Sequence, residues 1–87
     1  MNIPRDFCRS GQYTHVKLQL TSLDPRFGNL IEIHERALAK DPERFGEYEE
    51  EIDCWIARID DIPAAIYYSF ENHVLHLLTI VADVARN

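Results

Sequence analysis

The sequence predicts an α+β fold in which one or two helices pack on a small antiparallel sheet of three to four strands. Two observations carry this prediction. Residues 62–82 contain two apolar runs joined at Glu71-Asn72-His73, which is the pattern of a β-hairpin. Residues 25–40 instead repeat their apolar side chains at helical spacing. Because an apolar sheet face needs a covering layer, we expect the helix to lie on the hairpin.

Residues 1–12 show no periodic pattern, because Pro4 and Gly11 interrupt a few scattered apolar residues. Two alternatives stay open for them: a short strand at the edge of the sheet, or a loosely held arm. With 87 residues, the chain is near the lower size at which a protein can bury a sufficient core. We therefore predict a single domain over residues 1–87.

Residues 13–23 are ambiguous between a strand and a helix. Val16, Leu18 and Leu20 alternate as in a strand, whereas Val16, Leu20 and Leu23 fit one stripe of a helix. Leu and Gln outnumber β-branched residues in this segment, and this composition favours a helix.

A second helix is predicted to begin at Asp24-Pro25. An Asp side chain accepts hydrogen bonds from the free N–H groups of the first turn, and Pro fits the first helical position. Asp41-Pro42 predicts its end, since the residue before Pro avoids the helical conformation. The apolar stripe consists of Phe27, Leu30, Ile31, His34 and Leu38. The opposite, solvent-facing side is expected to carry Glu32, Glu35, Arg36 and Lys40. We interpret His34 as a histidine packed at the edge of the core.

Three strands are predicted after this helix. Cys54–Ile59 is the first, with a turn at Asp60-Asp61, and the hairpin supplies the other two. At a period of two, Ile66, Tyr68 and Phe70 share one face of the first hairpin strand. The corresponding face of residues 74–81 carries Leu75, Leu77, Thr79 and Val81. Because the other face of residues 74–81 is also largely apolar, we expect this strand to be central and covered on both sides.

The net charge of −6 disfavours RNA or the ribosome as a partner, because nucleic-acid affinity comes largely from Lys and Arg on phosphates. The acids instead concentrate before residue 54. Such a run is usually a solvated surface, and the functional alternative is a docking patch for a basic partner segment. The candidate partner-binding residues of this patch are Glu47, Glu49, Glu50 and Glu51.

Cysteine and histidine spacing indicates neither a metal site nor a cofactor. Cys8 and Cys54 form no C-x-x-C pair, and we expect two free thiols in a reducing cytosol rather than one disulfide. His73 and His76 are three residues apart on a hairpin, so they point to opposite faces. No apolar run approaches the roughly 20 residues of a membrane span, and the first residues lack a secretory signal. These features predict a cytoplasmic protein that does not enter a membrane.

From about residue 25 to residue 87, the sequence resembles the RelE/ParE superfamily of bacterial toxins, which includes plasmid-stabilisation toxins. The resemblance rests on the order and spacing of mostly apolar motifs. The helical motif is matched by Phe27, Ile31, Ala37-Leu38, Asp41-Pro42-Glu43-Arg44-Phe45 and Tyr48. The strand motifs are matched by Ile62-Pro63-Ala64-Ala65-Ile66-Tyr67-Tyr68, Glu71-Asn72 and residues 74–81.

The sequence departs from this family where RNA-cleaving members carry a basic set. Ala64-Ala65 stand where the family has an aromatic and a basic residue after Pro63. Of the basic residues that the family carries after the last strand, only Arg86 is retained. For a ribonuclease, the resemblance implies a catalytic set of Arg58, Tyr67 and Arg86. The hydroxyl donor of this set would be Tyr67 or, alternatively, Tyr68. The loss of charge predicts that RNA cleavage is not the activity.

The resemblance implies a toxin-like protein that binds an antitoxin, and a gyrase-type target as in the ParE branch, rather than cutting RNA. Such binding requires an exposed apolar groove between helix and sheet. Two alternatives stay open: a weak RelE-type endoribonuclease, and a small acidic inhibitor or immunity-type protein. The sequence leaves the oligomeric state, including a homo-oligomer, undecided.

Overall fold

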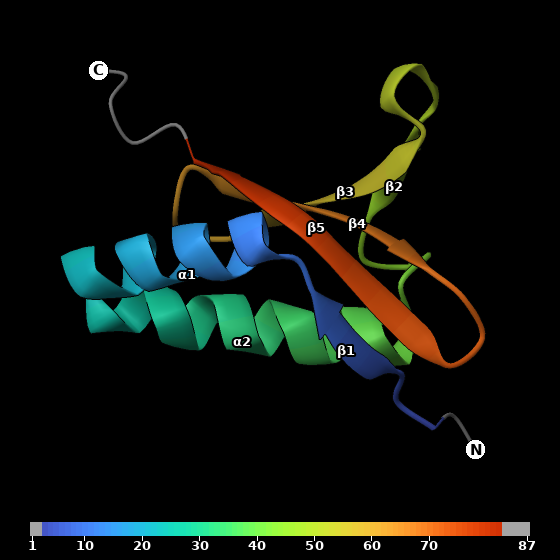
Figure 1. Ribbon diagram of the computed structural model, residues 1–87, viewed down its shortest axis with the longest axis horizontal. Coiled ribbons are helices and arrows are strands. Elements are labelled where there is room, and N and C mark those ends of the chain that lie inside the picture. Colours follow the sequence, from blue (N-terminus) through green and yellow to red (C-terminus); the bar gives the residue numbers. More distant parts are fainter. Residues whose placement is uncertain (1–2, 83–87) are drawn as a thin grey trace.

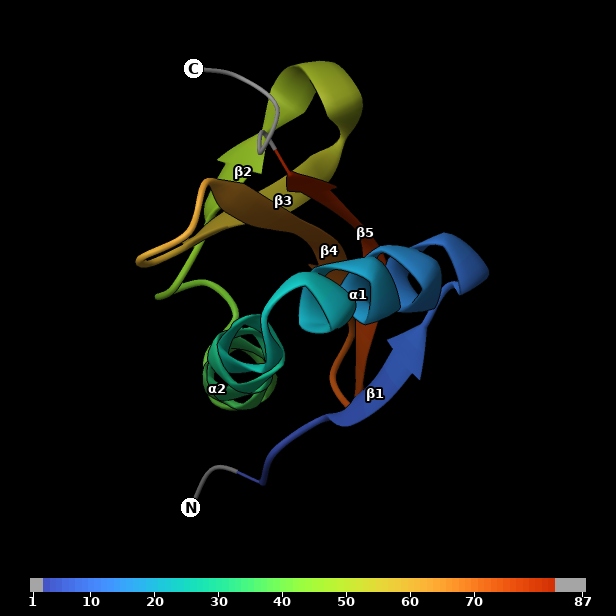
Figure 2. The same ribbon diagram turned by 90° about the vertical axis from the view of Figure 1, so that its left-hand side faces the viewer.

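Five strands and two helices follow one another along the chain, and the computed structural model describes them within residues 3–82. Figure 1 and Figure 2 show both helices on the same side of the sheet, so the predicted α+β class is confirmed. No helix within these residues is both long enough and apolar enough to cross a membrane. The elements are β1 (Asp6–Arg9), α1 (Gly11–Leu23), α2 (Pro25–Lys40), β2 (Glu47–Glu49), a 3₁₀ turn η1 (Glu50–Ile52), β3 (Cys54–Ile59), β4 (Ala64–Phe70) and β5 (Val74–Ala82).

The sheet has five strands in the order β1-β5-β4-β3-β2, and β1 runs parallel to β5. The prediction of three to four antiparallel strands was therefore wrong in number and in direction. β1 corresponds to the edge-strand alternative left open for residues 1–12, whereas β2 was not predicted. Both strands are short and carry exposed side chains, so the sequence pattern alone indicates them only weakly. They form because neighbouring strands offer free edges: Asp6 N–H donates to the His73 carbonyl (2.9 Å), and Glu47 pairs with Ile56.

The two helices begin and end with local capping. The Ser10 side chain accepts a hydrogen bond from Tyr13 N–H at the start of α1, which settles residues 13–23 as helical. Asp24 ends α1 and caps α2 by accepting from Arg26 N–H (3.0 Å), with Pro25 in the first turn. α2 stops before Asp41, as predicted.

The core lies between the helices and one face of the sheet. Tyr68 and Leu77 are fully buried there, and Trp55 is half-buried beside Tyr68 and Phe70. The remaining core is made by Tyr13, Leu20, Ile31, Leu38, Ala39, Ala57, Ile59, Ala64, Ile66, Leu75 and Ile80.

The prediction that both faces of β5 are covered was wrong. A bulge in β5 opposite Tyr67 and Tyr68 changes the alternation, because Tyr68 pairs with Leu77 while Tyr67 pairs with Thr79. Ile80 therefore joins the core, and Val81 points away from it. Neither helix covers the outer face, where Leu78 is 39% and Val81 48% exposed.

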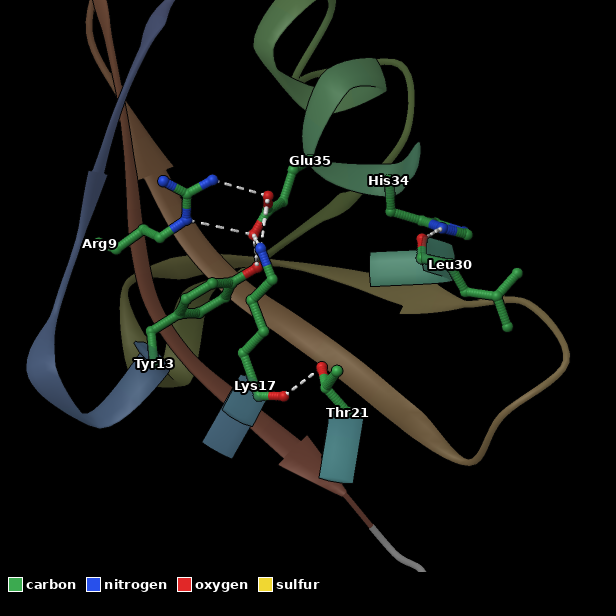
Figure 3. A network of polar contacts seen from close by, with 7 residues as sticks. All are labelled: Arg9, Tyr13, Lys17, Thr21, Leu30, His34 and Glu35. Atoms are coloured by element: carbon green, nitrogen blue, oxygen red, sulfur yellow. Dashed lines mark hydrogen bonds and ion pairs between the residues drawn. The ribbon is translucent and has the colours of Figure 1, made fainter. Parts of the chain in front are cut away.

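Glu35 is the largest departure from the predicted helix faces, since its side chain is buried (1% exposed) rather than solvated. Figure 3 shows three donors converging on its carboxylate. Arg9 of β1 donates from Nη2 (2.8 Å), the Tyr13 hydroxyl donates at 2.7 Å, and Lys17 Nζ lies 3.2 Å from both oxygens. Helix periodicity could not indicate this, because the compensating donors come from other elements.

Two opposing effects set the pKa of Glu35. Burial raises it, because a charged carboxylate loses its hydration. Hydrogen bonds from Arg9 and Tyr13, together with the charge of Lys17, outweigh burial and lower the pKa below its ordinary value of 4.5. Burial and the same hydrogen bond raise the pKa of Tyr13, so its hydroxyl stays a donor. Glu35 is therefore an ionised acceptor that connects α2 to β1 and α1.

We predict that Glu35→Gln destabilises the fold by about 3 kcal/mol, because the substitution leaves Arg9 and Lys17 without their counter-charge in a partly buried site. Urea unfolding at neutral pH measures this difference. Glu32→Gln is the matched control, since Glu32 is exposed on the same helix and should change the stability by less than about 0.5 kcal/mol. Equal effects of the two substitutions would contradict the structural role of Glu35.

A second prediction concerns pH. Because the pKa of Glu35 is lower in the folded than in the unfolded chain, its stabilising contribution is complete above about pH 4.5 and is lost as pH falls through the folded pKa. The difference in urea midpoint between the wild type and Glu35→Gln should therefore be constant near neutral pH and shrink on acidification below 4.5. A difference that stays constant down to pH 3 would show that the Glu35 charge does not contribute.

Candidate functional site: a groove between α2 and the sheet edge

A groove of about 720 Å³ lies between α2 and the strands β2 and β3. This volume is within the range of about 300–1,000 Å³ that is common for ligand clefts. The helix wall is formed by Ile33, His34, Ala37 and Leu38. The sheet wall is formed by Glu47, Glu49, Ile56, Ala57, Arg58 and Asp60. The loop that joins α2 to β2 contributes Arg44, Phe45 and Gly46.

The loop before β2 is held beneath the sheet by Tyr68. The Tyr68 hydroxyl donates to the Pro42 carbonyl, and burial raises the pKa of this hydroxyl, which keeps it protonated. A Cβ at position 46 would lie 2.0 Å from the Tyr68 hydroxyl oxygen, so only glycine fits there. The close approach places Phe45 at the rim of the groove.

The rim of the groove exposes apolar side chains beside charges. Ile33 is 51% and Phe45 48% exposed, and the Arg44 guanidinium lies 5.5 Å from the centroid of the Phe45 ring. None of the ion pairs found within residues 3–82 involves the arginines or glutamates of the groove. This surface therefore offers both apolar contacts and unpaired charges to a binding partner.

His34 closes one end of the groove. Its Nδ1 lies 2.8 Å from the Leu30 carbonyl, and its Nε2 accepts a hydrogen bond from the Asp60 N–H (3.4 Å). His34 thus connects α2 to the turn after β3, in agreement with its interpretation as a packed histidine.

The structure divides the predicted acidic patch. Glu47 and Glu49 lie on β2 and line the groove. Glu50 and Glu51 lie in η1, where both are exposed and neither lines the groove.

The predicted ribonuclease residues are brought together only in part. Arg58 pairs with Ala65, and Tyr67 pairs with Ile56, so both side chains point to the outer face in diagonal positions. Arg86 lies outside the described residues. Tyr68 was proposed as an alternative hydroxyl donor, but it is buried and donates to Pro42, so this assignment was wrong.

The sequence reasoning missed Ile33, Phe45 and Gly46 as residues of the site. Ile33 is apolar but lies outside the predicted stripe of α2. This apolar residue away from the core-facing side was the one signal in the sequence that could have indicated the site. Gly46 acquires its role only through contact with Tyr68, which is 22 positions later in the sequence (68 − 46). Residues that meet across such a separation leave no local pattern.

The described residues offer few groups for covalent or metal chemistry. Cys8 is exposed and Cys54 buried, and both are free thiols. Residues 3–82 contain no group of three or more His, Cys, Asp or Glu side chains arranged to hold a metal ion.

Comparisons with known proteins do not place the chain in a family. No family model matches it, and no curated protein matches it. The RelE/ParE resemblance therefore stays a prediction.

We predict that Gly46→Ala destabilises the protein by about 2 kcal/mol, because the new methyl group would overlap the buried Tyr68 hydroxyl and force the loop outward. Thermal and urea unfolding measure the effect. Gly11→Ala is the control, since a Cβ there meets nothing within 4 Å. A Gly46→Ala protein as stable as the wild type would disprove the packing of this loop against Tyr68.

Proposed function

We propose that this chain is a toxin-like protein of a bacterial toxin–antitoxin system, which acts by binding proteins rather than by cleaving RNA. The observation that carries this proposal is the groove beside α2, where Ile33 and Phe45 are about half exposed. Exposed apolar side chains gathered in a groove are typical of surfaces that bind a peptide segment or a helix.

The class of partner comes from the resemblance to RelE/ParE toxins, whose members are bound by antitoxins. We propose an antitoxin segment as the occupant of the groove, and a gyrase-type protein as a cellular target. The proposal places the protein in the cytoplasm, which agrees with its two free cysteines.

The two alternative functions have less support. Ribonuclease action would need a positively charged surface, but the chain carries nine Lys and Arg against fifteen Asp and Glu. An acidic inhibitor would bind through an uninterrupted acidic patch, but Arg44 and Arg58 interrupt the acids of the groove. We therefore favour binding of a segment that uses apolar contacts as well as charge.

We predict that Ile33→Asp and Phe45→Asp each reduce binding of the antitoxin at least about tenfold, which corresponds to about 1.4 kcal/mol, because each buries a carboxylate against an apolar segment. The measurement is co-purification, followed by titration, with the product of the adjacent reading frame. Both side chains are about half exposed, so circular dichroism should show an unchanged fold.

The double variant Glu50→Lys/Glu51→Lys separates the proposal from the acidic-inhibitor alternative. Both residues lie outside the groove, so binding should persist if the groove is the site. Loss of binding in this variant, with the aspartate variants unaffected, would favour the acidic inhibitor. Growth arrest that requires Arg86 would favour the ribonuclease.

A further inference from the structure

The edge of β3 that borders the groove is only partly paired. β2 pairs with β3 from Cys54 to Ile56, whereas β3 continues to Ile59. Within the part of the chain that the structure describes, no strand lies beside Ala57, Arg58 and Ile59 on that side. Figure 2 shows this end of the sheet, where β2 and β3 lie over α2. A free strand edge inside a groove can accept an additional strand.

The free hydrogen-bonding groups of this edge belong to Arg58. Successive residues of a strand direct their N–H and C=O groups to opposite sides. The Ile56 carbonyl oxygen would lie 3.0 Å from a Cβ at Gly46, so it points toward β2. Asp60 N–H points to His34 on α2. By alternation, the N–H and C=O of Arg58 point to the same side, into the groove.

The surroundings of this edge specify the side chains of an added strand. Ala57 and Ile59 face the core, so residues opposite them would point toward Ile33 and Phe45 on the inner side. A residue opposite Arg58 would instead lie on the outer face, directly beside the guanidinium. Arg58 is exposed and takes part in none of the ion pairs among residues 3–82.

We propose that the groove binds an extended segment of a protein partner, which pairs antiparallel with β3 at Arg58 and carries an acidic residue between two apolar residues. The acidic residue lies opposite Arg58, and the apolar residues lie against Ile33 and Phe45. Two carboxylates of the groove lie near this position: Glu47, opposite Ile56, and Asp60, two positions after Arg58. Arg58 is nearer than either, because it is directly opposite the acidic residue. The antiparallel direction is favoured because its hydrogen bonds are perpendicular to the strands and slightly more stable.

This inference rests on the proposed function, because it specifies how the groove holds its partner. The length of the bound segment is limited by two neighbours of the free edge. β2 occupies the edge up to Ile56, and the Asp60–His34 hydrogen bond occupies the next outward N–H. The recognised core of the segment is therefore about three residues long.

The test uses a synthetic peptide with the central sequence Val-Glu-Val and the full chain labelled with ¹⁵N. We expect the peptide to shift the backbone amide signal of Arg58 and to slow its hydrogen exchange at least about tenfold, because that N–H becomes bonded. N-methylation of the central peptide amide, which faces Arg58, should weaken binding at least about tenfold. N-methylation of an adjacent valine amide, which faces away, should have little effect.

A charge exchange tests the acidic position. Arg58→Glu should weaken binding of the Val-Glu-Val peptide and strengthen binding of a matched Val-Lys-Val peptide, each by about fivefold to tenfold. Arg36→Glu is the control, since Arg36 is exposed on α2 and does not line this groove. Circular dichroism checks that both variants fold.

Three results would overturn the inference. The first is an Arg58 amide signal that does not change at millimolar peptide, and the second is equal binding of the two N-methylated peptides. The third is a shift of the Arg58 amide signal that depends on protein concentration without peptide, which would assign the edge to a second copy of the chain. The proposed function fails separately. If the peptide binds but the adjacent gene product does not, the antitoxin assignment fails and the strand pairing stands. If that product binds but leaves Arg58 unprotected, the strand pairing fails and the groove stands as a protein-binding site.

Discussion

The buried carboxylate of Glu35 is the interaction on which the arrangement of layers depends. A buried charge without partners costs several kcal/mol, so the helix that carries Glu35 can pack only where donors reach it. Those donors are supplied by β1 and α1 through Arg9, Tyr13 and Lys17. Packing of α2, formation of the first strand and closure of the helix pair are therefore mutually dependent. The two ends of the described chain are also connected, since β1 pairs with β5.

The two helices cover the sheet unevenly. α1 packs on β5 and on α2, close to the β1 side of the sheet. Toward the other edge, α2 is the helix that remains over β3, and His34 contacts Asp60 in the turn after β3. Between that contact and the start of β2, helix and sheet separate and leave the groove. The groove and the Glu35 network share no residue, so α2 uses different side chains for its polar anchoring and for the groove wall.

The loop between α2 and β2 adds the second condition for the groove. Because Gly46 passes against the Tyr68 hydroxyl, the loop lies under the sheet and does not continue along the edge of β3. β2 is therefore short, and Arg58 keeps its outward backbone groups free of a strand partner among the described residues. The same packing presents Phe45 at the rim. A single close contact in the core thus controls both the backbone edge and the apolar surface of the proposed binding site.

The sequence by itself determined the features that depend on near neighbours. Asp24-Pro25 and Asp41-Pro42 set the limits of α2 through capping and the restrictions that proline imposes, and alternating or β-branched residues located β3, β4 and β5. Tertiary structure decided what depends on distant residues: the burial of Glu35, the bulge that brings Ile80 into the core, and the pairing of β1 and β2. Strand edges and buried charges are satisfied by groups far away in the chain, so no local period records them.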